Sequence, residues 1–347
     1  MRRRGVTVLL GAVITALLSV GVLTAPIPYV VLGPGPTVNT LGSADDKQVI
    51  EVDGRQTSTS AGQLRLTTVG VQPEVKLLGA VAGWFSPDEA VVPRELIYPP
   101  GQSREQVDER NKEDFVASQS SAETAALREL GYPVQVVVKA VTPGGPSADQ
   151  LRPGDQITAV DGQPVSTARG LTELIRAKPA GTRFVINYLR GDGTGSATGS
   201  GAPRTAEVTT RAEPGEPPRI GVEIEQKQPH PFQLKINLAD IGGPSAGLMF
   251  ALGIIDKLEP EDLTGGQVIA GTGTIDDEGK VGPIGGIPQK LVGAKRAGAK
   301  VFLVPADNCA EATANPQSGL ALLRIGTLDE ALDALETLRA GGQPTRC

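Results

Sequence analysis

A serine stands in an unusual setting in the segment G-G-P-S-A-G, which runs from Gly242 to Gly247. The apolar run A-G-L-M-F-A-L-G-I-I-D-K-L follows Ser245 and predicts a buried helix. Proline is favourable near a helix start, so Ser245 should lie at or beside the helix N-terminus. Unpaired backbone N–H groups and the positive end of the helix dipole would stabilise an alkoxide or a tetrahedral oxyanion there. Ser245 is therefore a candidate nucleophile, although serine is also among the commonest helix caps.

A serine nucleophile needs a base, and the chain has one histidine, His230. Prolines bracket His230 in K-Q-P-H-P, which is typical of a surface loop. A serine–lysine pair is the remaining class, and it requires an amine that is desolvated until it is neutral near pH 7. Lys290 is the candidate because it follows the turn 285–287, begins a predicted helix and has Leu291 and Val292 beside it. Most lysines are solvated surface groups, so the residue pattern alone leaves its role open.

The C-terminal part of the chain resembles the proteolytic domain of Lon proteases in several spaced motifs. These are P-S-A-G opening an apolar helix, T-G-T-I, K-V-G-P-I-G-G-I-P-Q-K-L-V-G-A-K-R-A-G and the strand V-F-L-V-P. The resemblance implies a serine endopeptidase in which Ser245 is the nucleophile, Lys290 is the general base and Thr272 helps to hold the lysine. The oxyanion hole would then consist of the backbone N–H groups of Ser245 and Ala246.

No cofactor and no metal are expected. The stretch 273–281 has valine where a phosphate-binding loop needs serine or threonine after the lysine, and G-T-G at 271–273 lacks the third glycine of a dinucleotide site. Cysteine and histidine are too few for a zinc site. The ATPase module of Lon proteases has no counterpart, so we expect substrates that are loose tails or already unfolded chains.

The middle of the chain, from Val134 to about Thr210, resembles a bacterial PDZ domain. Its signature is R-P-G-D-Q-I-T-A-V-D-G, with predicted strands at 156–160 and 183–189 and a helix at 167–177. The resemblance implies a groove between a strand and this helix, in which an extended peptide is added to the sheet edge. Gly131, Tyr132, Pro133 and Val134 would lie near the loop that receives the peptide carboxylate. The alternative is a spacer whose groove stays empty.

The N-terminus reads M-R-R-R and continues as an uncharged run from Gly5 to Thr24 that is long enough to cross a bilayer as a helix. A cleaved signal peptide is the alternative, but its apolar region is usually shorter and Pro26 is a poor residue after a cleavage site. We therefore expect a single-pass cell-membrane protein that contacts lipid through residues 5–24. Its N-terminus would be cytoplasmic and its bulk extracytoplasmic.

The two cysteines, Cys309 and Cys347, are the only thiols and form no C-x-x-C motif. In an extracytoplasmic chain they favour a disulfide that pins the C-terminal tail. Two unpaired thiols are the alternative.

These observations predict an α+β fold class in four parts. A cytoplasmic tip and transmembrane anchor occupy residues 1–25, and a strand-rich region at 26–125 packs with the catalytic domain. A PDZ domain, a small barrel-like sheet with helices, occupies 126–212, and a Lon-type proteolytic α+β domain occupies 213–347.

Taken together, the parts resemble the membrane-anchored PDZ–Lon-like serine proteases of Gram-positive bacteria. The implied function is cleavage of unfolded or membrane-proximal proteins whose tails bind the PDZ domain, and the implied assembly is a homo-oligomeric ring such as a hexamer. A non-catalytic PDZ scaffold with a Lon-like assembly domain is the alternative. The net charge of −6 and the lack of a basic stripe argue against nucleic acid as a partner.

Overall fold

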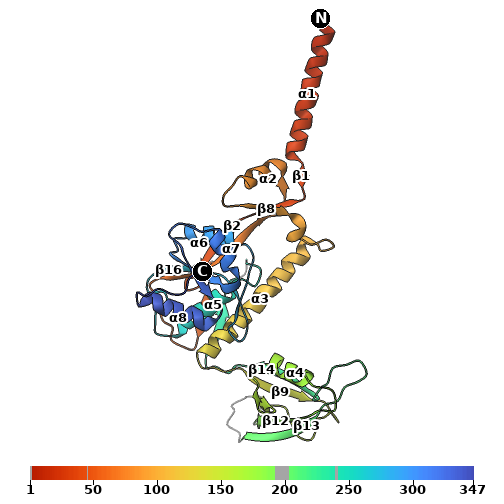
Figure 1. The fold of residues 1–347 in the computed structure, drawn as a ribbon, viewed down its shortest axis with the longest axis vertical. Coiled ribbons are helices and arrows are strands. Elements are labelled where there is room, and N and C mark those ends of the chain that lie inside the picture. The colour runs from red at the N-terminus through yellow and green to blue at the C-terminus, as the bar shows by residue number, and fades with distance from the viewer. Residues whose placement is uncertain (1, 45, 192–202, 239–240) are drawn as a thin grey trace. The chain divides into compact units, whose positions relative to one another are not determined.

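Strands from both ends of the chain share one six-stranded sheet (Figure 1). The computed structural model describes residues 2–44, 46–191, 203–238 and 241–347, without the side chains of 2–6 and 8. Two units divide the chain: the first comprises Met1–Ala125 and Leu234–Cys347, and the second is Ala126–Gln233. The second unit is therefore an insertion in the sequence of the first.

The sheet of the first unit has the strand order β20-β19-β16-β6-β2-β8. At its centre β6 runs parallel to β16 and antiparallel to β2, so one strand joins the N-terminal and C-terminal segments. Leu64 and Leu66 of β6 are fully buried and are separated by a single residue, as the period of a strand requires. The strand bounds are β2 (Tyr29–Asn39), β6 (Gln63–Gln72), β8 (Ala90–Pro93), β16 (Val268–Gly271), β19 (Val301–Pro305) and β20 (Ala321–Ile325).

Helices cover this sheet. The prediction of a buried apolar helix after Ser245 is confirmed by α5 (Gly247–Leu258), in which every residue except Lys257 is buried. Helix α6 (Ile287–Arg296) packs against β2 and β6. The other helical segments of this unit are α1 (Arg2–Thr24), α2 (Leu77–Trp84), η1 (Arg94–Leu96), most of α3 (Arg104–Glu129), η2 (Ala306–Asn308), α7 (Cys309–Ala314) and α8 (Leu328–Arg339).

Four short strand pairs complete the pairing. They are β1 (Pro26–Ile27) with β7 (Val75–Lys76), β3 (Ser43–Ala44) with β4 (Lys47–Gln48), β5 (Ile50–Asp53) with β15 (Gln233–Ile236), and β17 (Thr274–Ile275) with β18 (Val281–Gly282). The last pair lies between β16 and α6 in the sequence, so it belongs to the connection that joins Thr272 to Lys290.

The second unit is an antiparallel sheet in the order β13-β12-β10-β9-β14, with one helix, α4, packed against β14. The R-P-G-D signature forms a turn in which the buried carboxylate of Asp155 accepts from the backbone N–H of Arg152 and pairs with Arg190 at 3.0 Å. The predicted strands and helix of this region are present. Their bounds are β9 (Gln135–Val141), β10 (Gln156–Val160), β11 (Gln163–Pro164), α4 (Ala168–Arg176), β12 (Arg183–Leu189), β13 (Pro203–Thr209) and β14 (Val222–Lys227).

The predicted membrane anchor requires a correction. In the part of the chain that the structure describes, no helix combines the length and the apolar character needed to cross a membrane. This finding overturns the predicted single-pass location in the cell membrane, with a cytoplasmic N-terminus and an extracytoplasmic bulk. The lipid contact predicted for residues 5–24 depended on that location.

Candidate active site

Ser245 lies two residues before the first residue of α5 and is partly exposed. The position that caps the helix is occupied by Ala246, which has no side-chain hydrogen bond to offer. Ser245 therefore does not act as the cap of α5. Gly243 precedes it with a φ of 84°, in the left-handed region that favours glycine, so the chain can turn sharply just before the serine.

Lys290 lies in the first turns of α6 and is only 3% exposed. Its helix neighbours Ile287 and Leu291 are fully buried. Burial lowers the pKa of Lys290 to about 7, because an apolar setting disfavours the charged ammonium. Among the ion pairs of the described residues none includes Lys290, so no carboxylate restores the charged form. Near neutral pH this amine can act as a base.

Helix α6 approaches the sheet closely where it begins. Gly286, the residue before α6, has a φ of 72°. A Cβ atom at this position would lie 2.5 Å from Cγ2 of Val69 in β6, so only glycine fits. The turn therefore brings the start of α6, and with it Lys290, directly against β6.

Thr272 connects the lysine with the serine. Its hydroxyl donates to the carbonyl oxygen of Ser245 at 3.0 Å and accepts from Nζ of Lys290 at 2.9 Å. The side chain is fully buried at the end of β16. Since the hydroxyl hydrogen is used on Ser245, the oxygen can only accept from the lysine. A neutral amine that donates one N–H to Thr272 still has its lone pair available to accept a proton from another group.

A cavity of about 420 Å³ opens beside these residues. Both Ser245 and Lys290 line it, whereas Thr272 lies behind them. Much of the remaining wall is apolar and includes Val69 from the N-terminal segment and Ile284 from the loop before α6. Sequence patterns did not reveal the contribution of β6, because its residues lie about two hundred positions away from the motifs, as the bond from Thr67 to Gly271 with a separation of 204 illustrates.

His230 lies in the second unit, and the cavity walls include no part of it. Its Nδ1 is 2.7 Å from the carbonyl oxygen of Gln228, and its ring packs against those of Tyr132 and Phe232. The contacts of the imidazole described here are therefore all with residues of the second unit.

A second cavity, of about 390 Å³, lies along α4 and the edge strand β14. Leu171, Thr172 and Ile175 line it from the helix, and the loop Pro218–Gly221 lines it from the start of the strand. The predicted carboxylate loop, residues 131–134, does not contribute to this wall; it precedes β9, and the carbonyl oxygen of Tyr132 accepts from Nε2 of Gln228. The sequence prediction did not use the segment R-I-G-V at 219–222, in which Gly221 has a positive φ and lies just before the edge strand β14.

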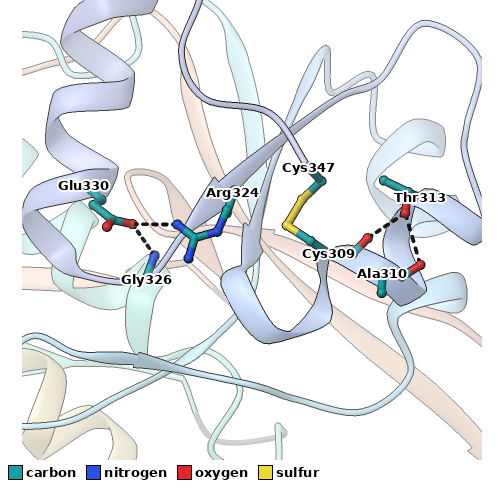
Figure 2. The surroundings of a disulfide bond; sticks show 7 residues. All are labelled: Cys309, Ala310, Thr313, Arg324, Gly326, Glu330 and Cys347. Atoms are coloured by element: carbon teal, nitrogen blue, oxygen red, sulfur yellow. Dashed lines mark hydrogen bonds and ion pairs between the residues drawn. A yellow bond between two sulfur atoms is a disulfide. The ribbon is translucent and has the colours of Figure 1, made fainter.

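Cys309 and Cys347 are joined by a disulfide, which ties the C-terminal residue to the start of α7 (Figure 2). Both cysteines pack against the apolar cluster that contains Ile287 and Leu291, the neighbours of Lys290. The argument for this pairing from an extracytoplasmic location no longer applies, so in solution the bridge stays a prediction.

Comparisons with known proteins match two parts of the chain. A model of the Lon protease (S16) C-terminal proteolytic domain matches residues 239–338. The chain contains a Lon-type serine peptidase domain. A PDZ domain model matches residues 106–199. The chain is thus a mixed α+β protein with a PDZ domain and a Lon-type proteolytic domain.

The curated relatives are Lon proteases. Lon protease 1 of Sorangium cellulosum is 42% identical over 101 residues, which cover 28% of this chain and 12% of that protein. Lon protease 2 of Bacillus subtilis is 34% identical over 113 residues, covering 31% and 20%. The Lon protease of Haemophilus influenzae is 34% identical over 119 residues, covering 33% and 14%. The matched part therefore spans 20% or less of the length of these relatives.

Several similar solved structures are PDZ domains. The PDZ domain of an SdrC-like protein from Listeria monocytogenes is 29% identical, covering 26% of this chain and 85% of that one, with a TM-score of 0.22. Its counterpart from Listeria innocua is 25% identical, covering 28% and 99%, with a TM-score of 0.23. Scores this low carry no argument about the fold.

The buried lysine predicts an unusual dependence of stability on pH. The folded pKa is about 7, whereas an unfolded lysine has a pKa of about 10.4. Between these values the unfolded chain binds more protons, so this group makes stability rise with pH from about 7 to about 10. Lys290→Met removes the buried amine and should stabilise the folded chain at pH 7 by on the order of 1–4 kcal/mol, with the gain shrinking as pH rises.

Urea unfolding of the full chain between pH 6.5 and 9.5 measures this gain, with Lys300→Met, at an exposed position, as the matched control. A constant difference between Lys290→Met and the parent chain across this pH range would contradict the proposed neutral lysine.

Proposed function

We propose that this protein is a serine endopeptidase in which Lys290 activates Ser245. The observation that carries the proposal is the buried amine of Lys290, whose pKa is lowered to about 7 and which is linked through Thr272 to Ser245 at an open cavity. The Lon-type domain in which these residues lie supports the same chemistry.

In the proposed reaction Oγ of Ser245 attacks the carbonyl carbon of a peptide bond, and its proton passes to Nζ of Lys290. The resulting ammonium returns this proton to the leaving amine as the C–N bond breaks, which leaves an acyl group on the serine. Lys290 then takes a proton from water as the hydroxide adds to the acyl carbon, and the ammonium returns this proton to Oγ of Ser245 as the ester C–O bond breaks. Thr272 keeps the amine oriented throughout the reaction by accepting a hydrogen bond from it.

The negative oxygen of the tetrahedral intermediate needs donors. The backbone N–H groups of Ser245 and Ala246 lie just before the first turn of α5, where the helix dipole is positive. We assign them as the oxyanion hole. Removing one such donor typically lowers kcat by about 10²–10³-fold.

The second unit is proposed to recruit substrate tails. Strand β14 is an edge strand beside α4, and the cavity of about 390 Å³ between them can take an extended peptide by strand addition. The substrates proposed are loose tails and unfolded chains, because strand addition requires an extended peptide. Assembly into a homo-oligomeric ring stays a prediction from the resemblance.

The rival function is a PDZ scaffold whose Lon-type domain has lost catalysis. Active-site labelling separates the two, because only a working serine–lysine pair makes Ser245 reactive.

A fluorophosphonate probe should label the full chain at Ser245. Ser245→Ala removes the nucleophile and Lys290→Ala removes the base, so each variant should lose labelling and peptide cleavage by at least about 10³-fold. Because the two residues act as one unit, the double variant should be no worse than either single variant. Circular dichroism checks that the folds are intact. Full labelling of Lys290→Ala would exclude the lysine as base.

The pH dependence tests which residue is the base. Lys290 is active only when neutral, so kcat/KM for an uncharged peptide should rise with pH through one ionisation near 7 and then level off. His230→Gln should leave this limb in place, since His230 lies in the second unit. A limb that shifts or disappears in His230→Gln would assign the base to the histidine instead.

The groove is tested by filling it. Thr172→Trp places a large ring in the cavity along α4 and should weaken binding of a fluorescein-labelled apolar peptide with a free C-terminus by about 10-fold or more. The full chain carrying Ser245→Ala prevents cleavage during the titration. Thr205→Trp, on the opposite edge strand β13, is the matched control. Equal affinities of the two tryptophan variants would place the peptide elsewhere.

A further inference from the structure

Helix α3 touches the segment around Ser245 from outside the Lon-type domain. Its part in the first unit contacts the loop at 242–245, here called the serine loop, and helix α5 at three points. The backbone carbonyl of Asn111 accepts from the N–H of Gly243 at 2.7 Å. The hydroxyl of Ser118 donates to the carbonyl oxygen of Pro244 at 2.9 Å. The ring of Phe115 packs edge-on against Phe250 of α5, with 5.8 Å between centroids.

Ser118 contributes a buried hydroxyl to this contact. It is 5% exposed and lies on the same face of α3 as the buried residues Phe115 and Ala122, at spacings of three and four. Its surroundings are tight, because a Cβ atom on Gly247 would lie 2.9 Å from the Ser118 hydroxyl oxygen. A buried hydroxyl costs free energy unless it is paired, and here its partner is Pro244.

The bond to Pro244 acts on the catalytic serine through the peptide plane. The carbonyl of Pro244 and the N–H of Ser245 belong to one planar unit, and the peptide bonds of the described chain are all trans. In a trans peptide the N–H points opposite to the C=O, so fixing the carbonyl oxygen on α3 turns the Ser245 N–H away from α3. That N–H is one of the two donors assigned to the oxyanion hole.

The next peptide plane is held in the same way from the other side. The carbonyl oxygen of Ser245 accepts from Thr272 at 3.0 Å and from the N–H of Gly273 at 2.9 Å. This plane carries the N–H of Ala246, the second donor. The two donors are thus aimed by two independent anchors, Ser118 on α3 and the 272–273 segment after β16.

We propose that Ser118 is a positioning residue that orients the Ser245 N–H toward the developing oxyanion. The proposal rests on the proposed function, because it needs Ser245 as the nucleophile. It adds a contribution from α3, a helix that precedes the Lon-type domain in the sequence. Since the oxyanion exists only in the tetrahedral state, loss of Ser118 should lower kcat and leave KM nearly unchanged.

A matched pair of variants isolates the hydroxyl. Ser118→Thr and Ser118→Val have the same branched shape and fill the tight site equally, but only threonine can donate to Pro244. Steady-state kinetics on a fluorogenic peptide, divided by the fraction of chains that a fluorophosphonate titrates, give kcat per active site. We expect Ser118→Thr to exceed Ser118→Val in kcat by about 10-fold or more, with KM values within about 3-fold. Ser120→Ala, an exposed serine on the same helix, should behave as the parent chain.

A peptide boronate, which forms a tetrahedral adduct on a serine, provides a second measurement. It should bind Ser118→Val about 10-fold or more weakly than Ser118→Thr, whereas a cleaved product peptide should bind both equally. A purely structural role would lower the titrated fraction or the melting temperature and would leave kcat per titrated site and boronate affinity the same in the pair. Equal values for the pair, in a chain whose Ser245 is labelled, overturn the positioning role alone. Absence of labelling at Ser245 in the parent chain overturns the proposed function and the positioning role with it.

Discussion

The chemistry proposed for the first unit depends on burial of the Lys290 amine. Lys290 would carry a charge on the surface, and in this unit its side chain is covered by apolar neighbours and offered a single hydroxyl. Burial of a charge is costly, so the neutral amine is the form that fits. The cover must come from both ends of the chain, because α6 packs on β2 and β6 as well as on its own domain. The N-terminal strands are in this sense part of the catalytic apparatus without supplying a catalytic group.

Small residues make this cover possible. Helix α5 lies close to β16, since a Cβ atom on Gly271 would lie 2.6 Å from the sulfur of Met249. One turn further along α5, a Cβ atom on Gly253 would lie 2.7 Å from Thr40 and from Ile50 of the N-terminal segment. A chain rich in glycine can therefore bring its backbone segments close together around the site.

Ser245 and Lys290 were candidates from local patterns, and the resemblance to Lon proteases then suggested their roles and that of Thr272. A proline and small residues precede an apolar helix at Ser245, and a glycine turn precedes a lysine with apolar neighbours at Lys290. No local pattern indicates Ser118, because its proposed role depends on a contact with Pro244, which lies 126 residues away in the sequence. The resemblance to a PDZ domain placed residues 131–134 near the loop that receives the peptide carboxylate, whereas the cavity along α4 is lined by the segment with the positive-φ glycine before β14. The membrane anchor was inferred from hydropathy alone, and the described helix does not meet the requirement.

The central place of β6 has a consequence for how the protein is made. Its neighbours in the sheet are β2, which is synthesised before it, and β16, which follows only after the whole second unit. During translation, one edge of β6 therefore stays unpaired until β16 has been synthesised. The inserted unit can fold in the meantime, because the strands of its sheet, β9 to β14, all lie within that unit. An open apolar edge invites aggregation, so the nascent chain needs shielding until β16 is released. Because Lys290 lies beyond β16 in the sequence, the cavity proposed for catalysis is also incomplete until that segment has emerged.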